Sequence, residues 1–69
     1  MEIVVNGERV AVDDSRPTLA SLLQRQGVAS LDTVSVQLNG EFVDQGHFSS
    51  TVLSAGDEVE FLYFMGGGR

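Results

Sequence analysis

The 69-residue chain has no cysteine, one histidine and only four basic residues, and each shortage excludes a class of site. Without cysteine the chain can form neither a disulfide nor a thiolate metal site, and it has no thiol nucleophile. The single histidine, His47, would need several carboxylate partners to build a metal centre, and we interpret it as a surface loop residue. We therefore predict no bound metal or cofactor and no catalytic side chains.

The shortage of basic residues also bears on the partners of the chain. Ten acidic residues against four basic ones give a formal net charge of −6 at pH 7. Such a field repels phosphate backbones, which argues against a nucleic-acid partner. It suits docking onto a basic protein surface, although acidity also simply keeps a small protein soluble.

Long apolar runs are missing as well. No run approaches the length of a membrane span, and residues 1–5 lack the basic region and long apolar stretch of a signal peptide. We expect no membrane partner and a cytoplasmic location. A chain of this length forms one domain with a thin core and has little room for an interior ligand pocket. An active site within the chain is therefore not expected.

The first twelve residues predict a β-hairpin. Asn6-Gly7 separates two runs that are rich in β-branched residues. Asn-Gly is the strongest short hairpin signal, because both turn residues must adopt positive φ. Alternation along the two runs places four side chains on one buried face: Ile3, Val5, Val10 and Val12.

One helix is predicted over residues 18–26. Thr18 is the candidate N-cap, because its hydroxyl can accept from backbone N–H groups that have no partner within the helix. Gly27 suits the left-handed position just past the helix end. Leucines at spacing i, i+3 and i+4 form an apolar stripe: Leu19, Leu22 and Leu23.

The second half of the chain predicts two strands and a short segment. Residues 34–38 alternate apolar and polar side chains, and a second turn signal, Asn39-Gly40, leads into a short edge segment at 41–43. Residues 44–50 are predicted as a loop or a short helical turn that Phe48 anchors to the core. After a turn at 55–57, the last strand covers residues 58–64.

The order hairpin, helix, strand, short segment, strand indicates the α+β class. It matches the ubiquitin-like β-grasp arrangement, in which a mixed sheet of four to five strands packs on one main helix. A ferredoxin-like fold would need a second full helix, and residues 44–50 are too few for one. We assign residues 1–65 to the β-grasp domain and residues 66–69 to a flexible C-terminal tail.

The end of the chain, Gly66-Gly67-Gly68-Arg69, is its one low-complexity stretch. Glycine loses the most conformational entropy on ordering and has no side chain to pack, so this stretch does not suit a packed strand. One interpretation is a frayed end without function. The other is a slender arm that enters a partner's active site, where its terminal carboxylate is the reactive group.

The last strand favours the second interpretation. If its odd-numbered residues face the helix, Leu62 and Phe64 face outward beside the tail, and Glu58 and Glu60 are solvated strand residues. Small soluble proteins seldom leave two large apolar side chains exposed together without a partner. We predict docking contacts at Leu62, Phe64 and Met65. The alternatives are that Phe64 folds over the rim of the core or that the protein dimerises.

Several motifs, taken in order, resemble the ThiS family. Residues 56–61 (GDEVEF), which lead toward the glycines, are similar to the end of ThiS proteins, and residues 36–41 (VQLNGE) are similar to their central strand and turn. The opening hairpin and the helix start at Thr18-Leu19 also match, so the resemblance spans essentially the whole chain. Each motif alone is weak, whereas their order, spacing and glycine end together are specific.

The resemblance implies a sulfur carrier of thiamine biosynthesis that is a cosubstrate and not an enzyme. In that family a ThiF-like adenylyltransferase uses ATP and Mg²⁺ to adenylate the terminal glycine carboxylate. Persulfide sulfur, from a source such as a cysteine desulfurase, then replaces AMP and leaves a thiocarboxylate. A ThiG-like thiazole synthase accepts this sulfur into the thiazole ring. Carried over to this chain, Gly67 and Gly68 are the functional residues and Gly66 adds reach.

The last residue departs from the family pattern. ThiS proteins typically end in glycine, whereas this chain ends in Arg69, and Gly68 falls where the family's last glycine would be when counted from Gly56. The bulk and charge of arginine would hinder threading of the tail into an active site. We expect a peptidase to remove Arg69 before Gly68 is adenylated; the alternative is that Arg69 is a tolerated natural end.

Other functions fit the same scaffold. A sulfur carrier of molybdopterin synthesis resembles this fold and tail but is usually longer, and sulfur donation to another acceptor would use the same chemistry. A ubiquitin-like modifier would be joined through its glycine to lysines of other proteins. A plain β-grasp interaction module would use only the sheet face, and it would still function after deletion of residues 66–69.

Overall fold

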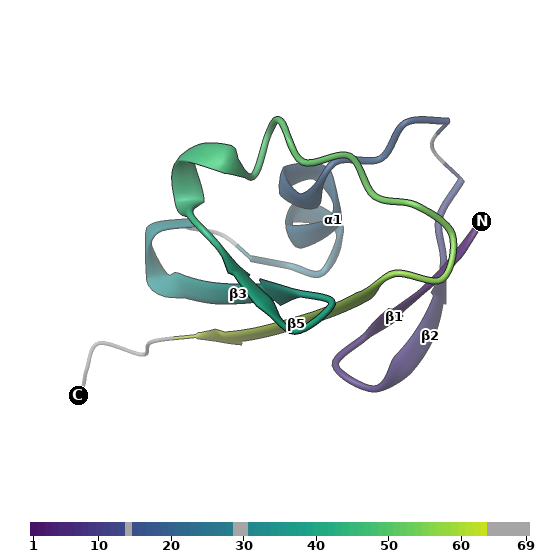
Figure 1. Ribbon diagram of the computed structural model, residues 1–69, viewed down its shortest axis with the longest axis horizontal. Helices are drawn as coiled ribbons and strands as arrows, with labels where there is room; N and C mark the ends of the chain where they lie inside the picture. The colour runs from purple at the N-terminus through teal and green to yellow at the C-terminus, as the bar shows by residue number, and fades with distance from the viewer. Residues whose placement is uncertain (14, 29–30, 64–69) are drawn as a thin grey trace.

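A computed structural model describes residues 1–13, 15–28 and 31–63, and of Tyr63 only the backbone. These residues form a sheet, one α-helix and two short 3₁₀ helices (Figure 1). The elements follow in the order β1 (Glu2–Val5), β2 (Glu8–Ala11), α1 (Leu19–Arg25), η1 (Leu31–Thr33), β3 (Val34–Leu38), β4 (Glu41–Val43), η2 (Gln45–His47) and β5 (Glu58–Tyr63).

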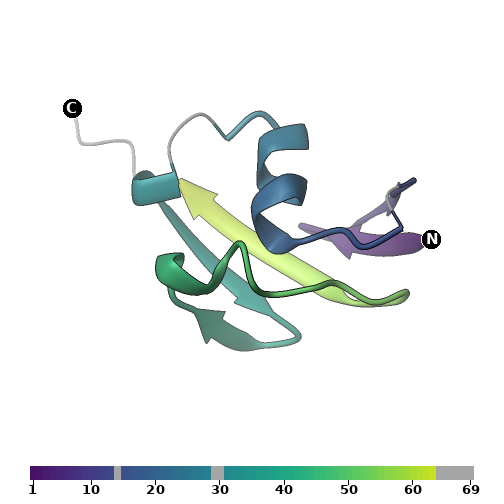
Figure 2. The same ribbon diagram turned by 90° about the horizontal axis from the view of Figure 1, so that it is seen from above.

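The sheet has five strands in the order β2-β1-β5-β3-β4. Its pairs are antiparallel except for β1 and β5, the two strands nearest the ends of the chain, which pair in parallel. Strand β5 runs the length of the sheet, from the side where the N-terminus lies to the opposite end (Figure 2). The expectation of an α+β, ubiquitin-like β-grasp fold with a mixed sheet and one main helix is confirmed.

Helix α1 begins and ends where its local sequence predicts. Thr18 is the N-cap, and its hydroxyl accepts from the Ser21 N–H at 3.1 Å while the Ser21 hydroxyl accepts from the Thr18 N–H at 3.0 Å, which completes a capping box. Gly27 has φ +87°, and its N–H donates to the Gln24 carbonyl at 3.1 Å. The Val28 N–H donates to the Leu23 carbonyl at 3.0 Å, so the helix ends in a Schellman motif.

The core lies between the sheet and the helix. Helix α1 and the segment from η2 to β5 are on the same side of the sheet (Figure 1), and Thr18 bridges to Val52 within that layer. Phe48 is 1% exposed and is among the largest buried side chains, so it anchors this segment as expected. Among the described residues, the buried hydrophobic side chains are Ile3, Val5, Val12, Leu19, Leu22, Leu23, Val28, Val34, Val36, Phe48, Leu53 and Val59.

The opposite face of the sheet has no helix over it in the described part of the chain (Figures 1 and 2). Nor do the described helices include one long and apolar enough to cross a membrane. Phe64, Met65 and the predicted tail, residues 66–69, lie outside the described residues. The division between residues 1–65 and 66–69 therefore stays a prediction.

Candidate functional site: the last strand and the uncovered sheet face

Strand β5 presents its two faces as alternation predicts. Val59 is fully buried and Phe61 packs against the core, whereas Glu58, Glu60 and Leu62 are exposed. Leu62 is 72% exposed and pairs with Ser35 of β3 on the uncovered face. The expected outward orientation of Leu62 is confirmed, and its role in docking stays a prediction.

A second large apolar side chain, Phe42 of β4, lies on the same face and is 74% exposed. The sequence predicts an edge segment at residues 41–43, and Phe42 is not among the docking contacts predicted from it. The register gives the reason for its orientation, because Val36 pairs with Val43 toward the core and Gln37 pairs with Phe42 away from it. The tight Asn39-Gly40 turn fixes that register, so the turn is the sequence signal from which the outward orientation of Phe42 could have been predicted.

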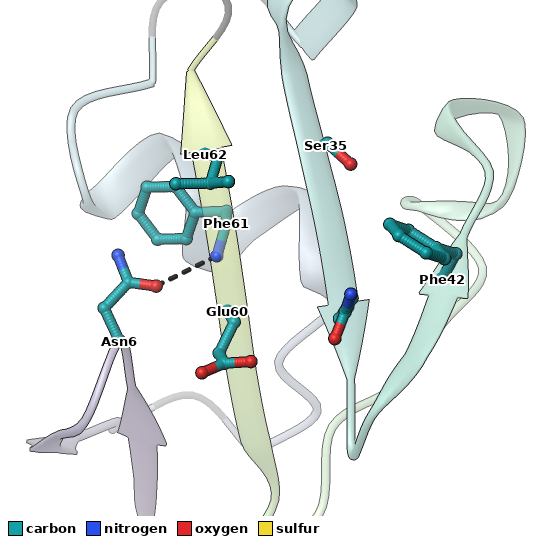
Figure 3. A pocket seen from close by; sticks show the side chains of 7 residues that line it. Asn6, Ser35, Phe42, Glu60, Phe61 and Leu62 are labelled. Atoms are coloured by element: carbon teal, nitrogen blue, oxygen red, sulfur yellow. Dashed lines mark hydrogen bonds between the residues drawn. The ribbon is translucent and has the colours of Figure 1, made fainter.

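Between these two side chains the sheet surface has a hollow of about 410 Å³. Leu62 lies at one side and Phe42 at the other, with the small side chain of Ser35 on the strand between them (Figure 3). Among the described residues that line the hollow, Glu60 alone is charged. The lining residues are Asn6, Ser35, Gln37, Phe42, Glu60, Phe61 and Leu62.

Two asparagines, one from each Asn-Gly turn, hold β5 by its backbone. At the start of β5 the Asn39 Oδ1 accepts from the Glu58 N–H at 2.9 Å, and the Asn39 N–H donates to the Glu58 carbonyl at 2.7 Å. Further along, the Asn6 N–H donates to the Val59 carbonyl at 2.9 Å and the Asn6 Oδ1 accepts from the Phe61 N–H at 2.9 Å. Both turns are predictable from the sequence, but these side-chain bonds are not, because they join residues far apart in the chain.

The side chains of this face suit contact with a protein surface. Two exposed apolar groups stand around a hollow with hydroxyl, amide and carboxylate groups, the mixed composition of a protein interface. Within the described ranges, no cluster of three or more histidine, aspartate or glutamate side chains could hold a metal ion. His47, the last residue of η2, is exposed, in agreement with its expected place on the surface.

The fold and this face define a small β-grasp protein whose central strand leads, beyond the described residues, into a glycine-rich segment. The ThiS family profile matches residues 1–68. The chain belongs to the ThiS family.

Solved structures and a further relative agree with this assignment. The crystal structure of a thiamine biosynthesis protein (ThiS) from Geobacter metallireducens is 43% identical and covers 99% of this chain and 100% of that one, with a TM-score of 0.82. A solution structure of a thiamine biosynthesis protein from the same organism gives 43% identity and a TM-score of 0.80, covering 100% of this chain and 90% of that one.

A protein from Magnetococcus marinus named thiazole synthase is 35% identical over 69 residues. The match covers 100% of this chain and 21% of that protein, so the chain spans about a fifth of the length of this relative.

Proposed function

We propose that this chain is a sulfur carrier for thiamine biosynthesis, in which the carboxyl group of Gly68 is the group that reacts. The observation that supports it best is the family match over residues 1–68, which extends through the glycine segment. The thiamine biosynthesis proteins of the same fold at 43% identity support the same pathway. The chain would be consumed and regenerated as a cosubstrate, and separate enzymes would catalyse each step.

The proposed chemistry converts the Gly68 carboxylate, a poor electrophile, into a thiocarboxylate in three steps. A carboxylate oxygen of Gly68 attacks the α-phosphorus of ATP, with Mg²⁺ bound by the activating enzyme, and pyrophosphate leaves. A persulfide sulfur from a cysteine-derived source then attacks the acyl carbon and displaces AMP. Cleavage of the resulting sulfur–sulfur bond by a thiol, which is oxidised to a disulfide, leaves the thiocarboxylate on Gly68.

The proposed partners are a ThiF-like adenylyltransferase, a sulfur source such as a cysteine desulfurase, and a ThiG-like thiazole synthase. The last is supported by the relative named thiazole synthase, because one part of that polypeptide aligns with all of this chain. Fusion of a carrier-like part to a larger part, the proposed synthase, is expected if a carrier and the enzyme that it serves work together. The pathway would operate in the cytoplasm.

The uncovered sheet face is the proposed docking surface for these enzymes. Leu62 lies near the end of β5, so an enzyme that acts on Gly68 passes close to it, and Phe42 extends the apolar contact across β3. Glu60, which lines the same hollow, favours a basic residue on the partner, in keeping with the net charge of −6. Phe64 and Met65, beyond the described residues, are the proposed continuation of this surface toward the tail.

We further propose that Arg69 is removed before activation and that residues 66–69 act as the arm. The peptide bond after Gly68 keeps its carboxyl group as an amide, which cannot attack ATP. Cleavage of that bond frees the carboxylate. Gly67 and Gly66 then provide a backbone without Cβ atoms that can enter a narrow active site.

The test is the intact mass of the chain isolated from its native cell while thiamine synthesis is induced. We expect a species that lacks Arg69 and has one oxygen replaced by sulfur at Gly68. A variant that ends at Gly67 is the control and should remain unmodified. Full-length, unmodified chain alone would contradict the carrier function, and isopeptide conjugates to lysines of other proteins would instead identify a modifier.

A further inference from the structure

The backbone ladder between β1 and β5 ends well before β5 does. Val5 pairs with Val59, and the chain then turns at Asn6-Gly7. On its other side, β5 remains paired with β3 as far as Tyr63, which lies opposite Val34. The part of β5 that leads toward Gly66 therefore extends past the last residue of β1.

The side chain of Asn6 continues the ladder where the backbone of β1 stops. The Asn6 backbone turns away with φ +50°, while its Oδ1 accepts from the Phe61 N–H at 2.9 Å (Figure 3). In a parallel ladder, a backbone carbonyl of the neighbouring strand would accept from this N–H. The side-chain amide takes the place of that carbonyl and lets the hairpin hold β5 two residues beyond Val59.

We propose that Asn6 is a positioning residue for the tail: through Phe61 it holds the last part of β5 in the place from which Gly68 reaches the activating enzyme. The inference rests on the proposed carrier function and adds a residue that lies far from the tail in sequence. Losing one net hydrogen bond lowers the equilibrium constant for holding this part of β5 in place by about two- to tenfold, which sets the upper limit of the effect on the tail. Leu62 and Phe42 remain in place, but Asn6 itself lines the hollow between them, so the positioning role is measured as kcat at saturating carrier, separately from any change in KM.

Asn39 offers a matched control within the same chain. It also precedes a glycine in an Asn-Gly turn, has φ +52°, and accepts from a β5 N–H at 2.9 Å through Oδ1. Its acceptor bond is to Glu58 at the start of β5, away from the tail. Asn6→Gly and Asn39→Gly each delete one such bond, and glycine adopts positive φ without strain. Asn39→Gly also deletes the bond that Asn39 Nδ2 donates to Asp57 Oδ1 at 3.1 Å, so it should destabilise the fold at least as much as Asn6→Gly.

The experiment is ATP–pyrophosphate exchange by the purified adenylating enzyme of the same organism, with the carrier concentration varied and every variant in the same C-terminal form. We expect Asn6→Gly to lower kcat, measured at saturating carrier, by up to about tenfold. Asn39→Gly should leave kcat and KM close to those of the native chain, although its urea midpoint falls at least as far as that of Asn6→Gly. Asn6→Asp, which keeps an acceptor oxygen at this position, should restore most of kcat.

Three outcomes would overturn the inference. The first is equal loss of kcat in Asn6→Gly and Asn39→Gly, which would show a general effect of stability. The second is native kcat in a folded Asn6→Gly variant. The third is rapid hydrogen exchange of the Phe61 amide in the native chain, a measurement that needs no variant to fold. Exchange activity absent with the native sequence ending at Gly68 would overturn the proposed function and this inference together.

Discussion

Replacing Phe42 by alanine should weaken docking while leaving the fold stable. Phe42 is 74% exposed on the three-residue edge strand β4, so its ring contributes little to the core. Surface substitutions of this kind usually change the free energy of unfolding by less than about 0.5 kcal/mol. If the uncovered face is the docking surface, the same ring lies beside the hollow that a partner fills.

The size of the effect follows from the area that the ring offers. A phenylalanine exposes on the order of 200 Å², so about 150 Å² of Phe42 is open to solvent. Covering all of it would contribute about 4 kcal/mol at about 25 cal/mol per Å². Only part of this burial free energy appears in the free energy of binding, because association also loses entropy. Truncation of a central aromatic residue commonly lowers the binding free energy by about 2 kcal/mol. The expected loss of affinity is therefore about 30-fold.

The assay is titration calorimetry of the carrier with the purified adenylating enzyme, together with urea unfolding of each variant. Val52→Ala is the control, because Val52 is also an exposed apolar residue, 43% exposed, but lies on the helix side beside Thr18. We expect Val52→Ala to bind like the native chain. Phe42→Ala binding as tightly as Val52→Ala would refute the assignment of the docking surface to this face.

The remaining predictions concern the fold that positions this face. Phe48→Ala should lower the free energy of unfolding by about 3–5 kcal/mol, because a fully buried ring leaves a cavity; a loss below about 1 kcal/mol in urea titration would contradict this. Thr18→Ala should lower the free energy of unfolding by about 1 kcal/mol, because it removes the hydroxyl that caps α1. Thr18→Ser keeps a capping hydroxyl and should keep most of that free energy. Gly27→Ala should lower the free energy of unfolding by about 1 kcal/mol, because an alanine at φ +87° is strained. Gly46→Ala should be nearly neutral, because φ is not positive at Gly46. Equal urea midpoints for the two glycine variants would show that backbone strain at Gly27 does not matter.

Local signals in the sequence were sufficient for most of the elements. Asn-Gly pairs require positive φ at both residues, and both turns have it, at Asn6 and Asn39. The leucine stripe and the residues that cap α1 determined the helix to within a residue at each end. The 3₁₀ helix η1 was not predicted, because three residues carry no periodic pattern that distinguishes a single turn from a loop.

The candidate site was only partly predictable. Alternation along the last strand gave the outward orientation of Leu62, since successive strand residues face opposite ways. The same reasoning extends to Phe42 only when the register of β3 with β4 is followed through the turn. The glycine segment and Phe64 were singled out by sequence and family resemblance, and their roles stay predictions.

The sequence by itself determined where strands, turns and the helix begin and end, and which side chains of each element are apolar, because those properties depend on neighbours within a few residues. Only the tertiary structure decided that β1 and β5 pair in parallel at the centre of the sheet and that the Asn6 amide holds Phe61, 55 positions away along the chain. It also decided that Phe42 and Leu62 flank one hollow. Such contacts depend on which strands become neighbours, and the hydrophobic core selects that arrangement through the burial of the chain as a whole.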